Sequence, residues 1–152
     1  MKRSVLAATA IVCVLMGSNW ASAQSTPPGT VVVTPDKLMW KASPRVAGVE
    51  AAGLVGDSTK QGSYVERVRF PANFKVQSHT HPEERTYTII SGTWYVGWGD
   101  KFDEAKLIGL SAGSFYTESA NVPHFVATKG EPVVVQISGT GPTATKMLDA
   151  PK

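Results

Sequence analysis

The sequence has 152 residues, a length that suits a single domain with its own hydrophobic core. Hydrophobic residues make up 42% of the chain and charged residues 18%, with a formal net charge of +3. Part of that charge comes from Lys2 and Arg3 near the start. The sequence shows no basic stripe or basic helix, so its composition and charge argue against a nucleic-acid-binding protein.

Residues 1–23 have the pattern of a secretory signal peptide. After the basic start, the segment from Val5 to Met16 is almost wholly apolar, but it is too short to span a bilayer. The sequence Ala-Ser-Ala that ends at Ala23 supplies the small residues that a signal peptidase requires. We therefore predict cleavage after Ala23, a periplasmic or secreted chain, and no stable membrane anchor.

The exported chain is expected to begin with a short linker. Residues 24–30, with the sequence QSTPPGT, are polar and contain two prolines and a glycine. The only cysteine, Cys13, lies in the predicted signal peptide. Residues 24–152 can therefore form no disulfide, and they offer no thiolate to a metal or a substrate.

Residues 31–140 contain many short runs rich in Val, Ile, Tyr, Phe and Thr, separated by turn signals. The clearest is Tyr64–Phe70, in which apolar and charged residues alternate as in a half-buried strand. No window has a sustained helical period. We therefore predict an all-β sandwich or barrel that begins with a strand at Val31–Thr34. Residues 141–152 are expected to form a C-terminal tail.

The chain has three histidines: His79, His81 and His124. Residues two apart in a strand point to the same face, so His79 and His81 project together. His124 is distant in sequence, but it also begins a strand-like run. Imidazole nitrogen is a good ligand for Fe, Mn, Zn, Cu and Ni. A single histidine would be read as an ordinary polar residue, whereas the pair with a distant third favours a metal site.

The spacing around these histidines resembles the two motifs of the cupin family, small β-barrels that hold a metal in the barrel mouth. The first motif has glycine, two histidines, glutamate and glycine, and the corresponding positions here are Asn73, His79, His81, Arg85 and Gly92. The second has glycine, proline, glycine, histidine and asparagine, and the corresponding positions are Gly113, Ser119, Asn121, His124 and Thr128. The resemblance covers roughly residues 31–137 and is strongest to small single-domain, type-2-like cupins. It implies a double-stranded β-helix of the jelly-roll kind.

Two departures from the motifs preserve the local backbone. Asn73 and Asn121 stand where the family has glycine, each in a short turn. Asparagine is the non-glycine residue that best tolerates a positive φ angle, so we expect both turns to be kept. Ser119 in place of proline and Thr128 in place of asparagine are mild changes.

Arg85 is the departure that matters for chemistry, because it occupies the position of the family's carboxylate ligand and a guanidinium cannot bind a metal. In one interpretation, a bulge after Pro82 shifts the register, and Glu84 becomes a fourth ligand beside the three histidines. In a second, Glu84 points away, the histidines alone bind the metal, and Arg85 faces inward to clamp an anionic substrate. In a third, Arg85 abolishes the metal and makes a simple anion-binding pocket. The sequence leaves all three open.

The resemblance implies a metal-dependent enzyme, with an oxygenase-like reaction as the leading class and lyases and isomerases also found on this barrel. We expect one divalent transition metal, Fe(II) first and Mn, Zn or Ni as alternatives, held by the three histidines and Glu84. Tyr87 shares the strand parity of Arg85. Both are predicted to contact a small-molecule substrate.

Two other functions fit the same residues. One is a non-catalytic module that binds a small anion through Arg85, and the other is an interaction protein with a structural metal site. Cupins often dimerise, so the resemblance also implies a homo-oligomer. Metal binding requires neutral histidines, and we expect metal affinity to fall as the pH drops through the histidine range.

Overall fold

The computed structural model describes residues 26–148, so the predicted signal peptide lies outside the described residues. Residues 26–30 belong to a first unit and contain a turn in which the Thr30 amide donates to the Pro27 carbonyl at 3.1 Å. The second unit begins at Val31. In the part of the chain that is described, no helix has the length and apolar character needed to cross a membrane.

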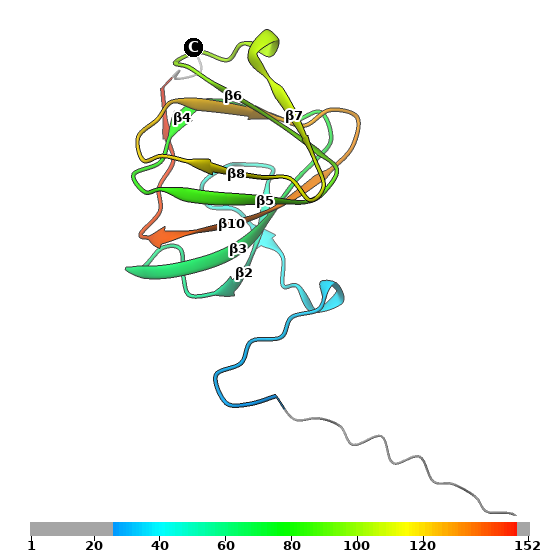
Figure 1. Cartoon of the computed structure of the whole chain (residues 1–152), viewed down its shortest axis with the longest axis vertical. Coiled ribbons are helices and arrows are strands. Elements are labelled where there is room, and N and C mark those ends of the chain that lie inside the picture. Colours follow the sequence, from blue (N-terminus) through cyan, green and yellow to red (C-terminus); the bar gives the residue numbers. More distant parts are fainter. Residues whose placement is uncertain (1–25, 149–152) are drawn as a thin grey trace, which may run out of the picture. The chain divides into compact units, whose positions relative to one another are not determined.

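The second unit is built from strands (Figure 1). In chain order they are β1 (Lys41–Ala42), β2 (Glu50–Val55), β3 (Gly62–Phe70), β4 (Lys75–Thr80), β5 (Arg85–Ser91), β6 (Thr93–Trp98), β7 (Ile108–Ser111), β8 (Phe115–Glu118), β9 (His124–Ala127), β10 (Val133–Gly141) and β11 (Lys146–Met147). The only helical turns among residues 26–148 are two short 3-10 helices, η1 (Pro35–Lys37) and η2 (Glu104–Lys106).

The strands form two antiparallel sheets. One has the strand order β1-β2-β3-β10-β5-β8 and the other β11-β4-β9-β6-β7. Strands distant in sequence are neighbours in both sheets, because the chain crosses repeatedly from one sheet to the other. Figure 1 shows β3, β10, β5 and β8 side by side in one layer. This arrangement is a double-stranded β-helix, and the predicted all-β barrel is confirmed.

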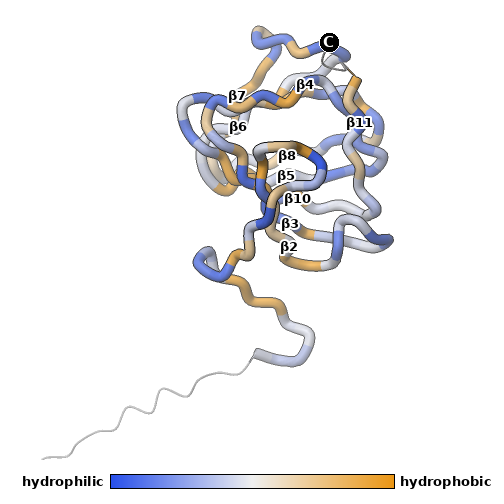
Figure 2. Tube along the Cα trace, turned by 180° about the vertical axis from the view of Figure 1, so that it is seen from behind, coloured by the Kyte–Doolittle hydropathy of each residue, from blue (hydrophilic) through white to orange (hydrophobic). Residues whose placement is uncertain are grey.

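An apolar interior lies between the sheets. Inward and partly exposed residues alternate along β3, as the pattern of Tyr64–Phe70 predicts. Figure 2 shows hydrophobic and hydrophilic residues mixed along the strands, as two-faced strands require. Both sheets contribute to one buried cluster, which consists of Val49, Tyr64, Val68, Phe70, Val76, Tyr87, Ile89, Trp94, Val96, Val126, Val133, Val135 and Ile137.

The two asparagines that replace motif glycines do adopt the left-handed conformation. The φ angle is 56° at Asn73 and 61° at Asn121. The motif glycine Gly92 has a φ angle of 74°, and a Cβ atom there would lie 2.7 Å from the Pro132 carbonyl oxygen. The turns at Asn73 and Asn121 thus have room for a side chain, and asparagine adopts their backbone conformation. The turn at Gly92 has no such room and requires glycine.

Both ends of the predicted barrel differ from the expectation. Residues 31–34 form no strand and are mostly exposed, because no strand of the barrel pairs with them and Pro35 starts η1 instead. At the other end, β10 extends to Gly141. β11 then pairs with β4, and the register of this pair puts Met147 opposite His79. The expected C-terminal tail therefore contains a strand that lies beside the histidines.

Candidate metal centre

The three histidines come from neighbouring strands of the five-stranded sheet. His79 lies in β4 directly opposite His124 in β9, and His81 follows the end of β4. The register between these strands shifts by one residue between Val76 and His79, which is a β-bulge. Val76 and His79 are three residues apart, a spacing that would turn them to opposite faces of a regular strand. The bulge lets Val76, His79 and His81 all face the interior. All three histidines are buried, and their ligand nitrogens lie within 4.8 Å of one another.

Each histidine is held through Nδ1 by a backbone carbonyl. The distances are 2.7 Å from His79 to Gln77, 2.8 Å from His81 to Ala144 and 3.0 Å from His124 to Val122. A carbonyl oxygen only accepts hydrogen bonds, so the neutral ring carries its proton on Nδ1 and leaves the Nε2 lone pair free. Metal-binding histidines are usually oriented in this way by an outer partner. The residues present therefore fit a divalent metal, which the three imidazoles could hold.

Burial keeps two of the rings neutral. Burial and, to a smaller extent, the nearby His124 lower the pKa of His79 to about 4. Burial also lowers the pKa of His81 to about 2, with the Arg85 guanidinium adding to the effect. Neutral imidazole is the form that binds metals, so both rings are ready for a metal at neutral pH.

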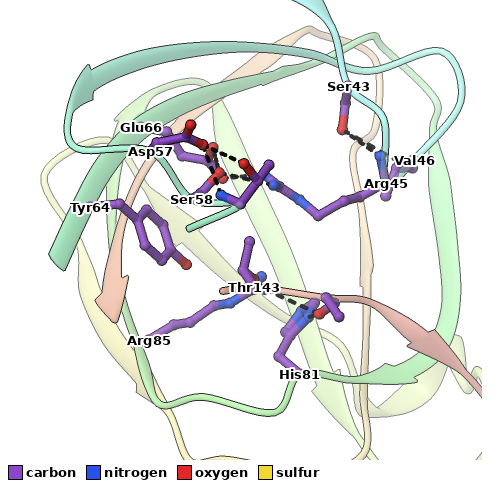
Figure 3. A network of polar contacts seen from close by, with 12 residues as sticks. Ser43, Arg45, Val46, Asp57, Ser58, Tyr64, Glu66, His81, Arg85 and Thr143 are labelled. Carbon is purple, nitrogen blue, oxygen red and sulfur yellow. Dashed lines mark hydrogen bonds and ion pairs between the residues drawn. The ribbon is translucent and has the colours of Figure 1, made fainter. Parts of the chain in front are cut away.

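Arg85 begins β5 and points into the barrel, with 5% of its surface exposed. Its Nε donates to Glu83 at 2.6 Å, and one terminal nitrogen donates to the Tyr87 hydroxyl at 3.4 Å. The other terminal nitrogen donates to the Thr143 hydroxyl and to the Ala144 carbonyl (Figure 3). The inward direction is the one that the second and third interpretations require. The charge of Arg85, however, is already paired with Glu83.

Glu84 does not reach the histidines. It is exposed and lines a hollow on the outer surface with Thr86 and Thr117. The register shift between β4 and β9 lies before His79, and the pairing of β5 with β10 and β8 is regular from Arg85 to Thr88. Because β5 begins with Arg85 facing inward, the one-residue step turns Glu84 to the opposite face. The interpretation that makes Glu84 a fourth ligand is therefore wrong for this structure.

The acid that does lie at the site is Glu118, a residue that the sequence reasoning missed. It ends β8, is 4% exposed, and its Oε1 lies 3.3 Å from Nε2 of His124. Burial raises the pKa of Glu118, although His124 acts in the opposite direction. Two features of the sequence could have identified Glu118 as a site residue. The alternation in Phe115–Glu118 puts Tyr116 and Glu118 on one face, and Glu118 stands just before the second motif's histidine.

A small cavity joins these groups. Its volume is about 50 Å³, and its lining includes the three histidines, Arg85, Tyr87 and Glu118 together with apolar residues of the core. Tyr87 is buried, and its ring stacks on that of Tyr116 with 4.6 Å between centroids. Burial also raises the pKa of Tyr87, so its hydroxyl stays protonated. The two residues predicted to contact a substrate thus face the cavity of the histidines.

Comparison with protein families agrees with the fold and the site. Residues 28–143 match the ChrR cupin-like domain family. The match covers most of the chain, and the chain belongs to this family of the cupin superfamily. A comparison with curated protein sequences found no significant match.

Several solved structures share the fold at low sequence identity. The polyketide cyclase RemF from Streptomyces resistomycificus is 11% identical, with a TM-score of 0.68 over 81% of this chain and 88% of the cyclase. The DMSP lyase DddQ from Ruegeria pomeroyi is 17% identical, with a TM-score of 0.55 over 74% of this chain and 67% of the lyase. A salicylate 1,2-dioxygenase from Pseudoaminobacter salicylatoxidans is 15% identical, with a TM-score of 0.56 over 70% of this chain and 31% of the dioxygenase. Such likeness shows the fold alone.

Proposed function

We propose that the protein binds one divalent transition metal through His79, His81 and His124 and uses it to act on a small organic molecule. The observation that carries this proposal is the arrangement of the three imidazoles. Each has Nδ1 bonded to a backbone carbonyl, and their ligand nitrogens lie within 4.8 Å of one another. Imidazole ligands suit Fe, Zn, Cu and Ni. Fe(II) is our first choice, with Mn, Zn or Ni as alternatives.

The bound metal would act as a Lewis acid and as a template for the substrate. The chain's own residues keep His79 and His81 neutral, and they exclude bulk water because the remainder of the cavity lining is largely apolar. A volume of about 50 Å³ leaves room for a small molecule only, well below the roughly 300 Å³ where typical ligand pockets begin. Arg85 and Tyr87 would face the polar end of that molecule.

We place the reaction in the oxygenase-like class, with lyase and isomerase chemistry as alternatives. The cyclase, lyase and dioxygenase that share this fold show that the barrel does not choose the reaction. A pure anion-binding module is the weaker candidate, because both guanidiniums that line the cavity of the histidines are already paired, Arg85 with Glu83 and Arg45 with Glu66.

Metal analysis tests this proposal directly. Residues 24–152 would be purified without chelator, exposed separately to Fe(II), Mn(II), Zn(II) and Ni(II), and washed before elemental analysis. We expect about one equivalent of one of these metals and its loss in His81→Ala, with Glu84→Gln unchanged as a control for loss of an acid. Less than about a tenth of an equivalent of every metal would rule the proposal out.

An oxygen-consumption screen of the metal-loaded protein with small carboxylic acids and diketones would then test the reaction class. Consumption that depends on substrate and is lost in His81→Ala supports an oxygenase. Product formation without oxygen uptake would move the protein to the lyase or isomerase class.

We further propose that the chain is exported, cleaved after Ala23, and assembles as a homo-oligomer. The apolar segment at the start and the dimers common among cupins support these two proposals. N-terminal sequencing of the exported protein and its mass in solution would test them. A chain that starts at Met1, or a monomer at physiological concentration, would contradict them.

A further inference from the structure

Glu118 is a buried acid to which the proposed function assigns no role. Strand β8 pairs with β5 so that Glu118 lies directly opposite Arg85. Arg85 stands at the position where the cupin motif has its glutamate. The carboxylate that is missing from β5 is therefore present on the neighbouring strand, at the same level of the barrel.

The surroundings of Glu118 fix its side chain but do not satisfy it. The Trp94 indole N–H donates to the Tyr116 hydroxyl at 3.0 Å, and that hydroxyl donates to Oε1 of Glu118 at 3.2 Å. The second oxygen, Oε2, is buried and accepts no hydrogen bond from any described residue. A buried carboxylate oxygen without a partner is costly, which indicates that a cation or a proton belongs at this position.

The contact between Glu118 and His124 points to a cation. In the neutral ring the proton of His124 lies on Nδ1, which donates to the Val122 carbonyl, so Nε2 has no hydrogen to donate to Glu118. When His124 carries the neutral ring that a metal requires, two acceptor atoms face each other at 3.3 Å. Two ligands of one metal, each about 2.1 Å from it and about 90–110° apart, are separated by about 3.0–3.4 Å. The observed distance lies within that range.

Glu118 contacts His124 but does not belong to the set of ligand atoms that lie within 4.8 Å of one another. We propose that its side chain turns toward the metal held by His79, His81 and His124 and becomes the fourth protein ligand. The carboxylate ligand of the cupin site has in effect moved from β5 to β8. Since the charge of Arg85 is paired with Glu83, the carboxylate of Glu118 remains available to offset that of the metal. This inference rests on the proposed function, because it requires that the histidines bind a metal.

The test measures affinity and coordination separately. Wild-type protein, Glu118→Gln and Glu84→Gln would be titrated with Zn(II) against a competing chelator, and their Co(II) complexes compared by visible absorption. Glu118→Gln keeps the size of the side chain and removes its charge, while Glu84→Gln makes the same change at an exposed position. We expect Glu118→Gln to lose affinity by about 100-fold or more, the upper end of what outer partners contribute. Its Co(II) spectrum should change, and Glu84→Gln should match the wild type in both.

An unchanged affinity and spectrum in Glu118→Gln would overturn the inference and leave the three-histidine site intact. A weaker affinity with an unchanged spectrum would also overturn it, since Glu118 would then position His124 without binding metal. If the wild-type protein bound neither Zn(II) nor Co(II), the proposed function would fail first. Should Glu118→Gln not fold, a crystal of zinc-loaded wild-type protein decides, since a carboxylate ligand lies about 2.0–2.2 Å from the metal.

Discussion

The two sheets contribute different chemistry to the same cavity. The five-stranded sheet supplies His79, His81 and His124, each fixed by a backbone carbonyl. The six-stranded sheet supplies the groups that carry charge or a hydroxyl, and these are fixed mainly by side chains, including those of Glu83, Thr143 and Trp94. The groups that this sheet supplies are Arg85, Tyr87, Tyr116 and Glu118.

This difference separates two tasks. Backbone carbonyls hold the imidazoles in one tautomer without a side-chain partner, which keeps the ligand set robust. Side-chain networks depend on every member, because a lost partner leaves a buried polar group unpaired. With the exception of the proposed ligand Glu118, substitutions in the six-stranded sheet should therefore act on stability, while substitutions in the histidine set should act on metal binding.

The largest effect is expected when Arg85 is replaced. Arg85→Met should lower the free energy of unfolding by about 3–5 kcal/mol, because it leaves the carboxylate of Glu83, whose side chain is only 10% exposed, without its cation. Urea unfolding of the metal-free protein measures this. The double variant Arg85→Met with Glu83→Gln should recover at least half of the loss. A single variant within about 0.5 kcal/mol of the wild type would show that the ion pair contributes little.

The fold and the three histidines could be predicted from the sequence, whereas the acid at the site, Glu118, was not. Alternation in Tyr64–Phe70 and the positions of Asn73 and Asn121 follow from local preferences, which one sequence displays. His79 and His81 were predictable because a strand repeats every two residues. The direction of Glu84 depends on the register of β5, which is set by its pairing with β10 and β8 and not by local preference.

The second prediction compares one residue from each sheet. His79→Ala should weaken Zn(II) binding by at least about 100-fold, because it removes a ligand and not merely an outer partner. Tyr87→Phe removes a hydroxyl that lines the same cavity but bonds to Arg85, and it should change Zn(II) affinity by less than about threefold. Competition titration measures both. Similar losses in the two variants would contradict the division between the sheets.

The third prediction concerns pH. The folded-state pKa values of His79 and His81 are lowered, to about 4 and about 2, so between these values and pH 6.5 the unfolded chain binds more protons. The stability of the metal-free protein should therefore be fully present above about pH 6.5 and fall as the pH drops from there. The slope should be up to about 1.4 kcal/mol per pH unit for each histidine.

Glu118 acts with the opposite sign. Its pKa is raised, so its contribution favours the folded state at low pH and is lost as the pH rises above about 4.5. Denaturant unfolding at several pH values between about 7.5 and 4.5 measures the net slope. His81→Asn should reduce the slope, because it removes one of the two titrating rings. A wild-type stability that stays level across this range would contradict the neutral state of the buried histidines.

The C-terminal segment was the part of the site least accessible to sequence reasoning. Residues 141–152 look like a tail because they contain two prolines and few apolar residues. Their role comes from long-range pairing, which places the Ala144 carbonyl against His81 and β11 against β4. Such contacts join residues about sixty positions apart, and they cannot be predicted from local sequence patterns.

The smallest effect is expected at Thr143, where the C-terminal segment links the two sheets. The Thr143 hydroxyl donates to Glu83 and accepts from Arg85, while the next residue holds His81. Thr143→Val keeps the shape and should cost about 1 kcal/mol of stability, the typical net value of a hydrogen bond, with a lower Zn(II) affinity of a few-fold. The exposed Thr140→Val serves as the control and should change neither. If Thr143→Val lowered stability but left Zn(II) affinity untouched, the segment would support the six-stranded sheet alone, and the orientation of His81 would not depend on that link.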